Sequence, residues 1–408
     1  MTDHATERRN MPLHGVHVLD LGQVYLGPYA GFLLAQAGAD VIKIEPVTGE
    51  PVRHRAKVSK WAAVPFEMLN GNKRGLALNL KSPEGIEILK ELVRTADILL
   101  ENYAPGVMDR LGVGWDVLSE INPRLIYGSG TGFGLSGPDR DNLAMDITVQ
   151  ACSGMMSVTG FADGPPVKAG PAVADFISGV HLYAALATAL YERSVTGRGR
   201  LVEVSMQEAV YPTLASNLAF AFDGEGEAPR TGNHHGAMAE APYNVYPTLD
   251  GHVAVIALTN GHWRSLLAAI GRQDLAGDAR FATSADRVRN MTLTDAIVGD
   301  WTRERPKAEV TQVLRAHKVP AAPVRHLGEV INDVHMHQRG ALEWVDHAKF
   351  GRIVVPSSPL RFHGADRPAY VASPELGEHN AEILLEHLRY EPERIAELAA
   401  RGVIGSGN

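Results

Sequence analysis

The N-terminal third of the chain alternates short apolar runs with amphipathic stretches, and this alternation constrains the fold more than any other feature. The runs 16–21 (VHVLDL), 40–45 (DVIKIE) and 75–80 (GLALNL) have the length and apolar content of buried strands. Residues 28–38 follow the first run, place apolar residues at helical spacing and end in a glycine. Strands that alternate with helices favour a parallel sheet covered by helices on both faces, so the sequence predicts an α/β fold.

The same alternation continues to about residue 206. Ser82 and Pro83 suit the N-cap and the first position of a helix that ends near Arg94. Residues 175–193 form one long helix, which is apolar along nearly its whole length and is therefore expected to be buried. Three more strands are predicted, at 97–102, 124–130 and 201–206.

The composition shifts after residue 220 and indicates a second, smaller domain. Residues 221–238 are rich in glycine and polar side chains, which is typical of a linker or a functional loop. A hairpin is predicted at 243–258, and three helical segments follow up to about Lys318. In the tail, a strand is predicted at 351–362 and a helix after Gly377. The predicted organisation is a large α/β domain over 1–210, a linker over 211–230, a small α+β domain over 231–325, a second linker over 326–345, and a C-terminal part over 346–408 that rejoins the large domain.

Charge and composition exclude several classes of protein. The chain has 39 Lys and Arg against 47 Asp and Glu and no long basic run, so we expect no nucleic-acid partner. The N-terminus is polar, and no uninterrupted apolar stretch approaches the length of a membrane-spanning helix, so we expect neither a signal peptide nor a membrane span. The single cysteine, Cys152, excludes an internal disulfide and fits a reducing compartment. These features predict a cytoplasmic protein.

The segment 132–137 (GFGLSG) formally matches the dinucleotide-binding pattern G-x-G-x-x-G and follows a predicted strand. Pro138 and Asp139 are a poor opening for the helix that such a site requires, and no suitable acid lies about 20 residues on. A turn is the favoured interpretation, and a nicotinamide-dependent oxidoreductase is kept as an alternative.

The histidines and the cysteine do not predict a metal site. Among 17 histidines there is no His-Glu-x-x-His or Cys/His zinc spacing. His335 and His337 would point the same way only on a strand, and His234 and His235 lie between glycines in a loop. Cys152 has no obvious base near it in sequence and is interpreted as a small buried hydrophobic residue.

Asp175 opens the long apolar helix. From its spacing alone the favoured role is an N-cap, with catalysis as the alternative. The positive end of the helix would keep the carboxylate ionised, and an ionised carboxylate is a nucleophile that needs no general base.

Basic residues lie near the ends of the predicted strands. Lys73, Arg74 and Lys81 flank the run 75–80, and Arg110 follows a later turn. A solvated face is the favoured role, and a clamp for the phosphates of a ligand is the alternative.

Four segments together resemble the class III CoA-transferases, a family that includes formyl-CoA transferase and shares its fold with the 2-methylacyl-CoA racemases. They are LDLGQVYLGPYAGFLLAQAGADVIKIE (19–45), NGNKRGLALNLKSPEG (70–85), ENYAPGVMDRLG (101–112) and ADFISGVHLYAALATALYERSVTGRG (174–199). The resemblance resumes at YNVYPTLDGHVAV, VPAAPV and LGEHNAEILL, so it covers nearly the whole chain.

The resemblance implies a Rossmann-like large domain that binds CoA, a smaller domain, and an interlocked homodimer in which each chain threads the ring formed by the other. It implies that Asp175 is the nucleophile, because the family's aspartate stands at the start of the long helix. It implies acyl-CoA and a carboxylic acid as substrates, with CoA entering as part of a substrate, and no permanently bound cofactor or metal. The implied CoA contacts are Val24 through its backbone, Leu78, Lys81, Asn102, Tyr103, Arg110, Thr131 and Phe133.

The sequence departs from formyl-CoA transferase at several of these positions. Pro46 replaces a basic residue, and Thr131 and Phe133 stand where that enzyme has lysine and tyrosine. The glycine-rich loop near the active site is replaced by residues 232–236 (GNHHG), which argues against formate–oxalate chemistry. The backbone N–H groups of this loop are expected to stabilise oxyanions.

The racemases of this fold use a His-Asp pair to exchange a proton beside the thioester carbonyl. In this sequence Met145 stands at the histidine position and Asp146 is retained. A thioether cannot accept that proton, so the sequence favours a transferase over the alternative of a racemase-like isomerase.

The expected reaction is transfer of CoA between two carboxylic acids through an anhydride and a thioester of Asp175. A catalytically silent CoA-binding protein is a further alternative. A small dicarboxylic acid, such as succinate or a C4–C5 relative, is the expected acid, because basic side chains in loops are suited to a second carboxylate. These candidates are Arg53, His54, Arg55, His234 and His235.

Overall fold

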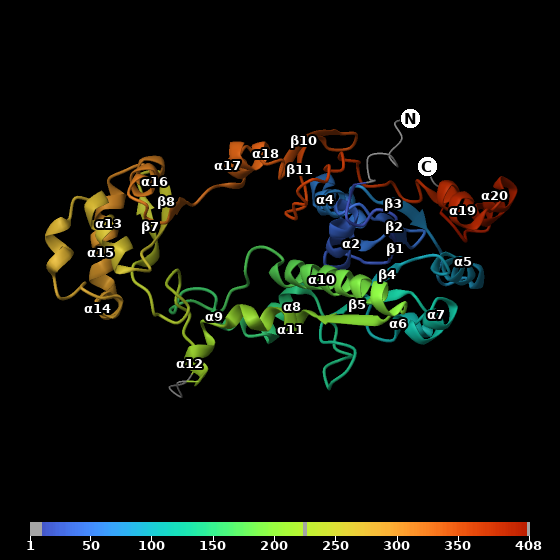
Figure 1. The fold of residues 1–408 in the computed structure, drawn as a ribbon, viewed down its shortest axis with the longest axis horizontal. Helices are drawn as coiled ribbons and strands as arrows, with labels where there is room; N and C mark the ends of the chain where they lie inside the picture. The colour runs from blue at the N-terminus through green and yellow to red at the C-terminus, as the bar shows by residue number, and fades with distance from the viewer. Residues whose placement is uncertain (1–9, 223–226, 406–408) are drawn as a thin grey trace. The chain divides into compact units, whose positions relative to one another are not determined.

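The computed structural model describes residues 10–222 and 227–405 (Figure 1). Contacts within the chain define two compact units. The first comprises Met1–Val149, Pro171–Val210 and Val334–Asn408, and the second comprises Gln150–Gly170 and Tyr211–Asp333. Residues 150–170 were expected in the large domain, whereas their contacts assign them to the second unit. The predicted segments over 1–9, 223–226 and 406–408 lie outside the described residues.

The first unit is built on a six-stranded sheet in the order β3-β2-β1-β4-β5-β6. Every neighbouring pair is parallel, with Val18 of β1 opposite Val41 of β2 on one side and Ile98 of β4 on the other. The prediction of an α/β fold with a parallel sheet is therefore confirmed. This order is that of Rossmann-type folds, and its switch point lies between β1 and β4. The strands are β1 (His17–Asp20), β2 (Asp40–Glu45), β3 (Arg74–Ala77), β4 (Ile98–Glu101), β5 (Ile126–Thr131) and β6 (Leu201–Ser205).

Helices cover this sheet. As predicted, Ser82 caps one of them: its hydroxyl accepts a hydrogen bond from the Gly85 N–H at 3.0 Å, and Pro83 follows it. The helices of the first unit are α2 (Leu26–Gln36), α3 (Pro51–His54), α4 (Val64–Asn70), α5 (Pro83–Val93), α6 (Val107–Arg110), α7 (Trp115–Ile121), α10 (Val173–Thr196), α11 (Met206–Val210), α18 (Val334–Gln338), α19 (Asn380–Leu388) and α20 (Pro392–Ala400), with short 3₁₀ turns η1 (Arg55–Lys57) and η2 (Lys60–Ala63). Helix α8 (Asp146–Cys152) crosses from the first unit to the second.

The end of the chain completes the core of the first unit. Ile383 and Leu384 of α19 and Leu398 of α20 are fully buried in the same apolar cluster as strand residues Leu76 and Leu99. The side chain of Asn380 also accepts a hydrogen bond from the Ala77 N–H of β3 at 2.9 Å. The C-terminal segment therefore packs on the sheet that the N-terminal third of the chain begins.

The long helix α10 is only partly buried. Ala174, Ser178 and Leu182 are buried, in a helix that packs on α2, β5 and β6, whereas Tyr191 is 74% exposed and Val195 is 71% exposed. The expectation that the whole helix is buried is therefore wrong for the single chain. By length and composition α10 could cross a membrane, and no other helix among residues 10–222 and 227–405 passes that test. Core helices of globular proteins pass the same test, so this is weak evidence of a membrane span; in α10 33% of the apolar window is buried within the chain.

The second unit has its own sheet and core. Antiparallel strands β7 (Tyr243–Thr248), β8 (Gly251–Ile256) and β9 (Ala321–Pro323) form the sheet, and the predicted hairpin is confirmed in β7 and β8. Its apolar core contains Trp263 and Phe281. In the fully described stretch between this hairpin and Lys318 there are four α-helices and the 3₁₀ turn η4 (Gln273–Gly277) rather than three segments. The predicted linker 326–345 contains short helices and the start of a strand. The helices are α9 (Met155–Val158), α12 (Leu218–Phe222), α13 (Asn260–Ala269), α14 (Ser284–Arg289), α15 (Met291–Arg303), α16 (Lys307–Ala316) and α17 (Leu327–Ile331).

A separate hairpin of β10 (Leu342–His347) and β11 (Gly351–Pro356) belongs to the first unit. The predicted strand at 351–362 is therefore shorter than expected. Beside it the buried carboxylate of Glu67 accepts hydrogen bonds from Ser373 Oγ at 2.6 Å and from the Ser373 N–H at 3.0 Å, and it contacts His347 Nε2 at 2.7 Å. These contacts join α4 to the C-terminal half of the unit.

Candidate active site

The loops after β1 and β4 meet at the switch point of the sheet. The Gln23 N–H donates to Asn102 Oδ1 at 2.6 Å, and Asn102 Nδ2 donates to the Gln23 carbonyl at 2.9 Å. Val24 adopts a φ of 65°, which is unusual for a β-branched residue, and its N–H donates to Glu50 Oε2 at 3.0 Å. In α/β sheets of this kind, ligands bind at the carboxyl ends of the strands beside the switch point. The strained backbone of Val24 therefore lies at the carboxyl end of the sheet, where a ligand is expected, and is held there by its hydrogen bond to Glu50.

The structure brings the predicted CoA-contact residues to this edge, because each follows or ends a strand of the parallel sheet. Lys81 and Arg110 are exposed, and neither makes an ion pair with a described residue. Burial raises the pKa of Tyr103 to about 12, and its N–H donates to Glu101 at 2.7 Å. The residues are Val24 after β1, Leu78 and Lys81 after β3, Asn102, Tyr103 and Arg110 after β4, and Thr131 and Phe133 at the end of β5.

Two of these residues have structural roles. Leu78 is fully buried and pairs with Ile404 in an isolated bridge, so its side chain belongs to the core. Thr131 Oγ1 accepts a hydrogen bond from the Gly134 N–H at 2.8 Å and holds the turn that follows β5.

That turn contains the GFGLSG segment. Gly134 and Gly137 have φ angles of 93° and 87°, values that favour glycine. No helix begins in the described chain between this turn and Asp146, so there is no helix N-terminus to receive a pyrophosphate. The dinucleotide-binding interpretation is wrong, and the glycines serve the turn.

Asp175 is the third residue of α10 and does not cap it. The helix begins after Ala172, and Asp146 Oδ1 accepts hydrogen bonds from the N–H groups of Ala174 at 2.9 Å and Asp175 at 3.3 Å. The N-cap interpretation of Asp175 is therefore wrong, because a carboxylate from α8 takes that role. Among the described residues, the Asp175 carboxyl group makes no hydrogen bond and no ion pair, although the residue is only 9% exposed.

The electrostatic setting of Asp175 also differs from the expectation. Burial, and then the negative charge of Asp146, raise its pKa to about 7, while the positive charge of Arg55 acts in the opposite direction. The helix end alone was expected to keep the group ionised. Desolvation outweighs that effect, so the protonated form of Asp175 is favoured far more than in a solvent-exposed carboxyl group.

Aromatic rings surround the start of α10. The Phe176 ring stacks with Tyr25 at 5.9 Å between centroids and meets Tyr29 edge-on at 4.8 Å. Arg55 NH1 donates to the Tyr25 hydroxyl at 2.6 Å. These contacts connect the first turn of α10, which carries Asp175, through Tyr25 to the Val24 loop.

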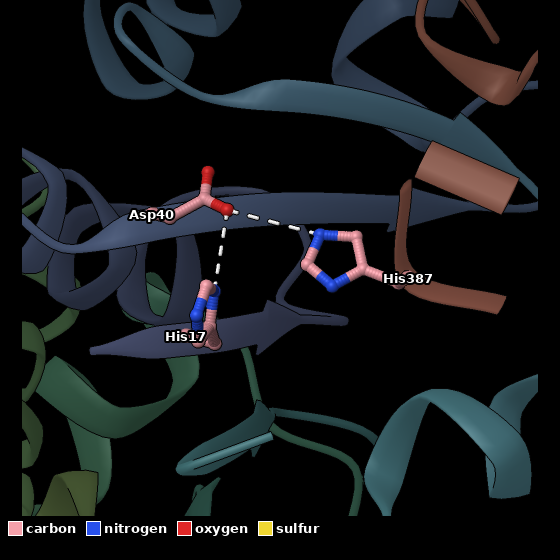
Figure 2. A group of neighbouring side chains, drawn as sticks. All are labelled: His17, Asp40 and His387. Atoms are coloured by element: carbon pink, nitrogen blue, oxygen red, sulfur yellow. Dashed lines mark ion pairs between the residues drawn. The ribbon is translucent and has the colours of Figure 1, made fainter. Parts of the chain in front are cut away.

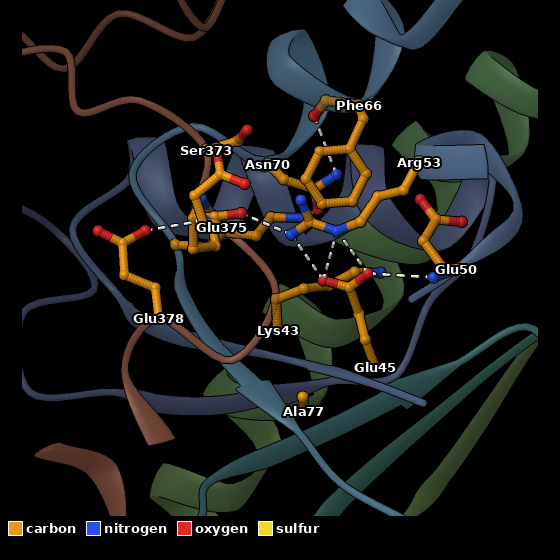
Figure 3. Close-up of polar contacts among 12 residues, drawn as sticks. Lys43, Glu45, Glu50, Arg53, Phe66, Asn70, Ala77, Ser373, Glu375 and Glu378 are labelled. Carbon is orange, nitrogen blue, oxygen red and sulfur yellow. Dashed lines mark hydrogen bonds and ion pairs between the residues drawn. The ribbon is translucent and has the colours of Figure 1, made fainter. Parts of the chain in front are cut away.

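Charged groups buried under the Val24 loop hold it in place. Glu45 accepts two hydrogen bonds from Arg53 Nε and one from the Glu50 N–H, and Figure 3 shows the Arg53 guanidinium between Glu45 and the Phe66 ring. The guanidinium carbon lies 3.8 Å from the centroid of that ring. Arg53 is thus committed to the protein itself and is not available to a substrate carboxylate.

Lys73 and Arg74 also have internal partners, so neither a solvated face nor a phosphate clamp describes them. Lys73 Nζ donates to Asp20 at 2.7 Å, both side chains are fully buried, and burial lowers the pKa of Lys73 to about 8. Arg74 binds Asp40 at the opposite, amino edge of the sheet, and it also donates to two glutamates of α19.

Three potential metal-ligand atoms meet at that amino edge. Figure 2 shows His17 and Asp40 on neighbouring strands facing His387 of α19, and these atoms lie within 4.8 Å of one another. The Arg74 guanidinium donates to Asp40 and lies 2.9 Å from His387 Nε2, so the cation of this cluster is an arginine. We assign the cluster to the attachment of α19.

The structure also places His335, His337 and Cys152, which the sequence analysis considered as possible functional residues. His335 and His337 lie on α18 and not on a strand, and the His337 ring stacks on Trp344. Cys152 is exposed, which contradicts its interpretation as a buried residue.

His234 contacts Asp295 of α15 through Nε2 at 2.7 Å, and the Tyr246 hydroxyl donates to the same carboxylate at 2.6 Å. Sequence reasoning missed Asp295 because it lies far along the chain on a different element. This contact anchors the Gly232–Gly236 loop to α15 of its own unit. The His234 side chain is therefore bound to Asp295 and is not available to a substrate carboxylate.

The chain matches the model of CoA-transferase family III over residues 13–380. It is 38% identical to formyl-CoA:oxalate CoA-transferase from Streptomyces avermitilis, over 96% of this chain and 99% of that protein. It is 35% identical to succinate–glutarate CoA-transferase from Agrobacterium fabrum, over 95% and 98% of the two chains. A CaiB/BaiF family protein from Brucella suis has a similar solved structure, with a TM-score of 0.80, 31% identity, and coverage of 93% of this chain and 100% of that chain.

The chain therefore belongs to CoA-transferase family III. It is an enzyme that moves CoA from an acyl-CoA thioester to a carboxylic acid.

Proposed function

We propose that this enzyme transfers CoA to a small dicarboxylic acid and that Asp175 is its nucleophile. The observation that carries the proposal is the Asp175 carboxyl group, which is buried in the first turn of α10 and has no partner among the described residues. The next residue, Phe176, contacts Tyr25 of the switch-point loop. A carboxylate without hydrogen-bond partners keeps its lone pairs available for attack. The acids named for the two relatives above, oxalate, succinate and glutarate, are dicarboxylic acids, with formate as the exception.

The reaction proceeds in four balanced steps. An Asp175 oxygen attacks the thioester carbonyl of the donor, the C–S bond breaks, and an anhydride and CoA thiolate form. The thiolate attacks the aspartyl carbonyl, which releases the donor acid and leaves an aspartyl-CoA thioester. The acceptor carboxylate attacks this thioester, forming a second anhydride and freeing the thiolate. The thiolate then attacks the acceptor carbonyl, so acyl-CoA leaves and the Asp175 carboxylate is regenerated.

The surroundings of Asp175 suit this sequence of steps. The rings of Tyr25, Tyr29 and Phe176 lie together at the start of α10, and we propose that they help to keep water from the anhydride. Asp146 bonds to the start of α10, and the thioether of Met145 beside it cannot serve as the base of a racemase.

A substrate panel tests the proposed function. Formyl-CoA and succinyl-CoA are offered as donors with mono- and dicarboxylic acids as acceptors, and new thioesters are measured by chromatography. We expect transfer to dicarboxylic acids. An enzyme that moves CoA only between monocarboxylic acids would contradict the proposal.

The rate is expected to rise with pH through about 7. Asp175 attacks only when ionised, and its pKa of about 7 means that protonation removes activity as the pH falls. In Asp146→Asn the amide oxygen can still accept the helix N–H groups, but the negative charge is lost, so the rising limb should move to lower pH. The kcat/KM for acyl-CoA between pH 5.5 and 9 measures this shift, and coincident profiles of the two enzymes would contradict it.

Lys81 and Arg110 are proposed to bind the phosphates of CoA. Their exposure without described ion pairs supports this role, and each charge-assisted contact is worth roughly 1.5–3 kcal/mol. Lys81→Ala or Arg110→Ala should therefore raise the KM for acyl-CoA about tenfold to a hundredfold, with a smaller effect on the acceptor KM. Arg94→Ala, which removes an exposed charge from the far end of α5, is the control. Equal losses for both substrates would indicate general damage.

We also propose the interlocked homodimer. Exposed apolar residues of α10, Val180 and Val195 among them, support a partner surface on this helix. Sedimentation at nanomolar concentration tests the dimer, which a folded monomer would contradict.

We also propose a cytoplasmic location. The chain has a single cysteine and so cannot form an internal disulfide, which fits a reducing compartment.

A further inference from the structure

Arg55 is an arginine near the nucleophile that the protein does not neutralise. It begins the turn η1 after β2, is half-buried, and makes no ion pair within residues 10–222 and 227–405. A guanidinium has five N–H donors, and the hydroxyl of Tyr25 occupies only NH1 at 2.6 Å. The remaining donors form a fork suited to a carboxylate.

The position of Arg55 relative to Asp175 is fixed by aromatic contacts. Its guanidinium carbon lies 5.4 Å from the centroid of Tyr25, and the Tyr25 ring stacks on Phe176, the neighbour of Asp175. The charge of Arg55 acts on the Asp175 carboxyl group, yet the two groups are farther apart than the 4.0 Å of an ion pair. The two groups therefore interact without pairing with each other, so that each can address one end of a dicarboxylate.

The other basic candidates of the sequence analysis differ from Arg55. Arg53 is bound to Glu45 and stacked on Phe66, and His234 is bound to Asp295. His54 is exposed at the end of α3. His235 lies in the second unit, where its ring meets the Tyr243 ring edge-on. Of the five candidates, Arg55 is the one whose charge acts on Asp175 and which also has a described anchor.

We infer that Arg55 is a specificity-determining residue that binds the second, unreacted carboxylate of the acid whose first carboxylate reacts at Asp175. The inference rests on the proposed function and adds the group that recognises a dicarboxylate. A monocarboxylate of the same length leaves the guanidinium without a partner in a partly desolvated site. The enzyme therefore prefers dicarboxylic acids, and Tyr25 positions the arginine for them.

The test compares acceptors that differ only in the second carboxylate. Oxalate, succinate and glutarate are paired with acetate, butyrate and valerate, and kcat/KM is measured for wild type, Arg55→Gln and Arg55→Lys. The assay runs at pH 8.5, where Asp175 is ionised even if loss of the Arg55 charge raises its pKa. We expect Arg55→Gln to reduce the dicarboxylate-to-monocarboxylate ratio roughly tenfold to a hundredfold. Arg55→Lys should restore part of the ratio, because the charge returns without the fork.

Lys57→Ala is the matched control, because it removes an exposed positive charge from the same turn and should leave the ratio unchanged. A wild-type enzyme that transfers CoA to no acid would overturn the proposed function itself. A wild type that prefers dicarboxylates, together with an unchanged ratio in Arg55→Gln, would overturn only the role of Arg55. A drop in rate that is equal for both members of each pair would also overturn it.

Discussion

Replacement of Asp175 by asparagine is expected to reduce CoA transfer by roughly 10⁴-fold or more while the protein stays folded. Asparagine has no ionised oxygen to form the anhydride, and loss of a covalent nucleophile removes the whole pathway. The Asp175 side chain does not cap α10, since Asp146 holds the helix start, so no cap is lost. The fold-change is measured as kcat with the best donor and acceptor of the substrate panel.

The stability of Asp175→Asn against unfolding provides a second, independent test of the same variant. The pKa of Asp175 is raised to about 7 in the folded protein, so this group contributes most to stability below its unfolded value of about 4. That contribution is lost as the pH rises through 7. At pH 8 the urea concentration at the midpoint of unfolding should therefore be at least as high for Asp175→Asn as for the wild type.

Trapping links the loss to chemistry. Wild-type enzyme incubated with acyl-CoA and then hydroxylamine should yield a hydroxamate on the peptide that contains Asp175, detected by mass spectrometry. Asp146→Asn should still be trapped, since Asp146 is a positioning residue. A fully active Asp175→Asn enzyme would end this mechanism.

The second large effect is expected on stability, at the buried pair of Asp20 and Lys73. Both side chains are fully buried, and Lys73 also donates to the Pro28 carbonyl and to Asn70. Lys73→Met leaves the Asp20 charge buried without its partner, which should reduce the free energy of unfolding by about 3–5 kcal/mol. Urea unfolding followed by circular dichroism measures the loss.

Lys90 provides the matched control. It pairs with Glu87 on the surface of α5, where an ion pair contributes about 1 kcal/mol or less. Lys90→Met should therefore shift the unfolding midpoint far less than Lys73→Met. The double variant Asp20→Asn/Lys73→Met should recover part of the loss, because it no longer buries an unpaired charge. Equal effects of the two lysine substitutions would contradict the assignment.

Local patterns in the sequence were sufficient to predict the strands of the parallel sheet and the cap of a helix beside it. The run 40–45 became β2 with the same bounds, and Ser82 caps α5 as its spacing predicts. Such features depend on neighbours within a few residues, so a single sequence contains them. The nucleophile and the edge of the sheet that carries the CoA positions came from the family resemblance, and their roles stay predictions.

Other features depend on contacts between distant segments and could not be predicted. Lys73 was expected at the surface, but its partner Asp20 lies 53 residues away across the sheet. Asp146 holds the start of α10 from 28 residues earlier in the chain, so the apparent cap residue Asp175 was left without that role. The apolar side chains of α10 would be the same whether its own chain or a partner covered them. The exposure of this helix in the single chain could therefore not be predicted from its sequence.

The closure of the first unit by its last residues has a consequence for synthesis on the ribosome. The carbonyl of Ala77 in β3 accepts a hydrogen bond from the Gly405 N–H, and Ile404 pairs with Leu78. The apolar core of the first unit is therefore completed only when residues 380–405 have left the exit tunnel. The second unit, whose last residue is Asp333, is fully synthesised well before that point. During synthesis the second unit can therefore reach its final fold while the first unit still lacks helices α19 and α20. This reverses the usual N-terminal-first order of folding.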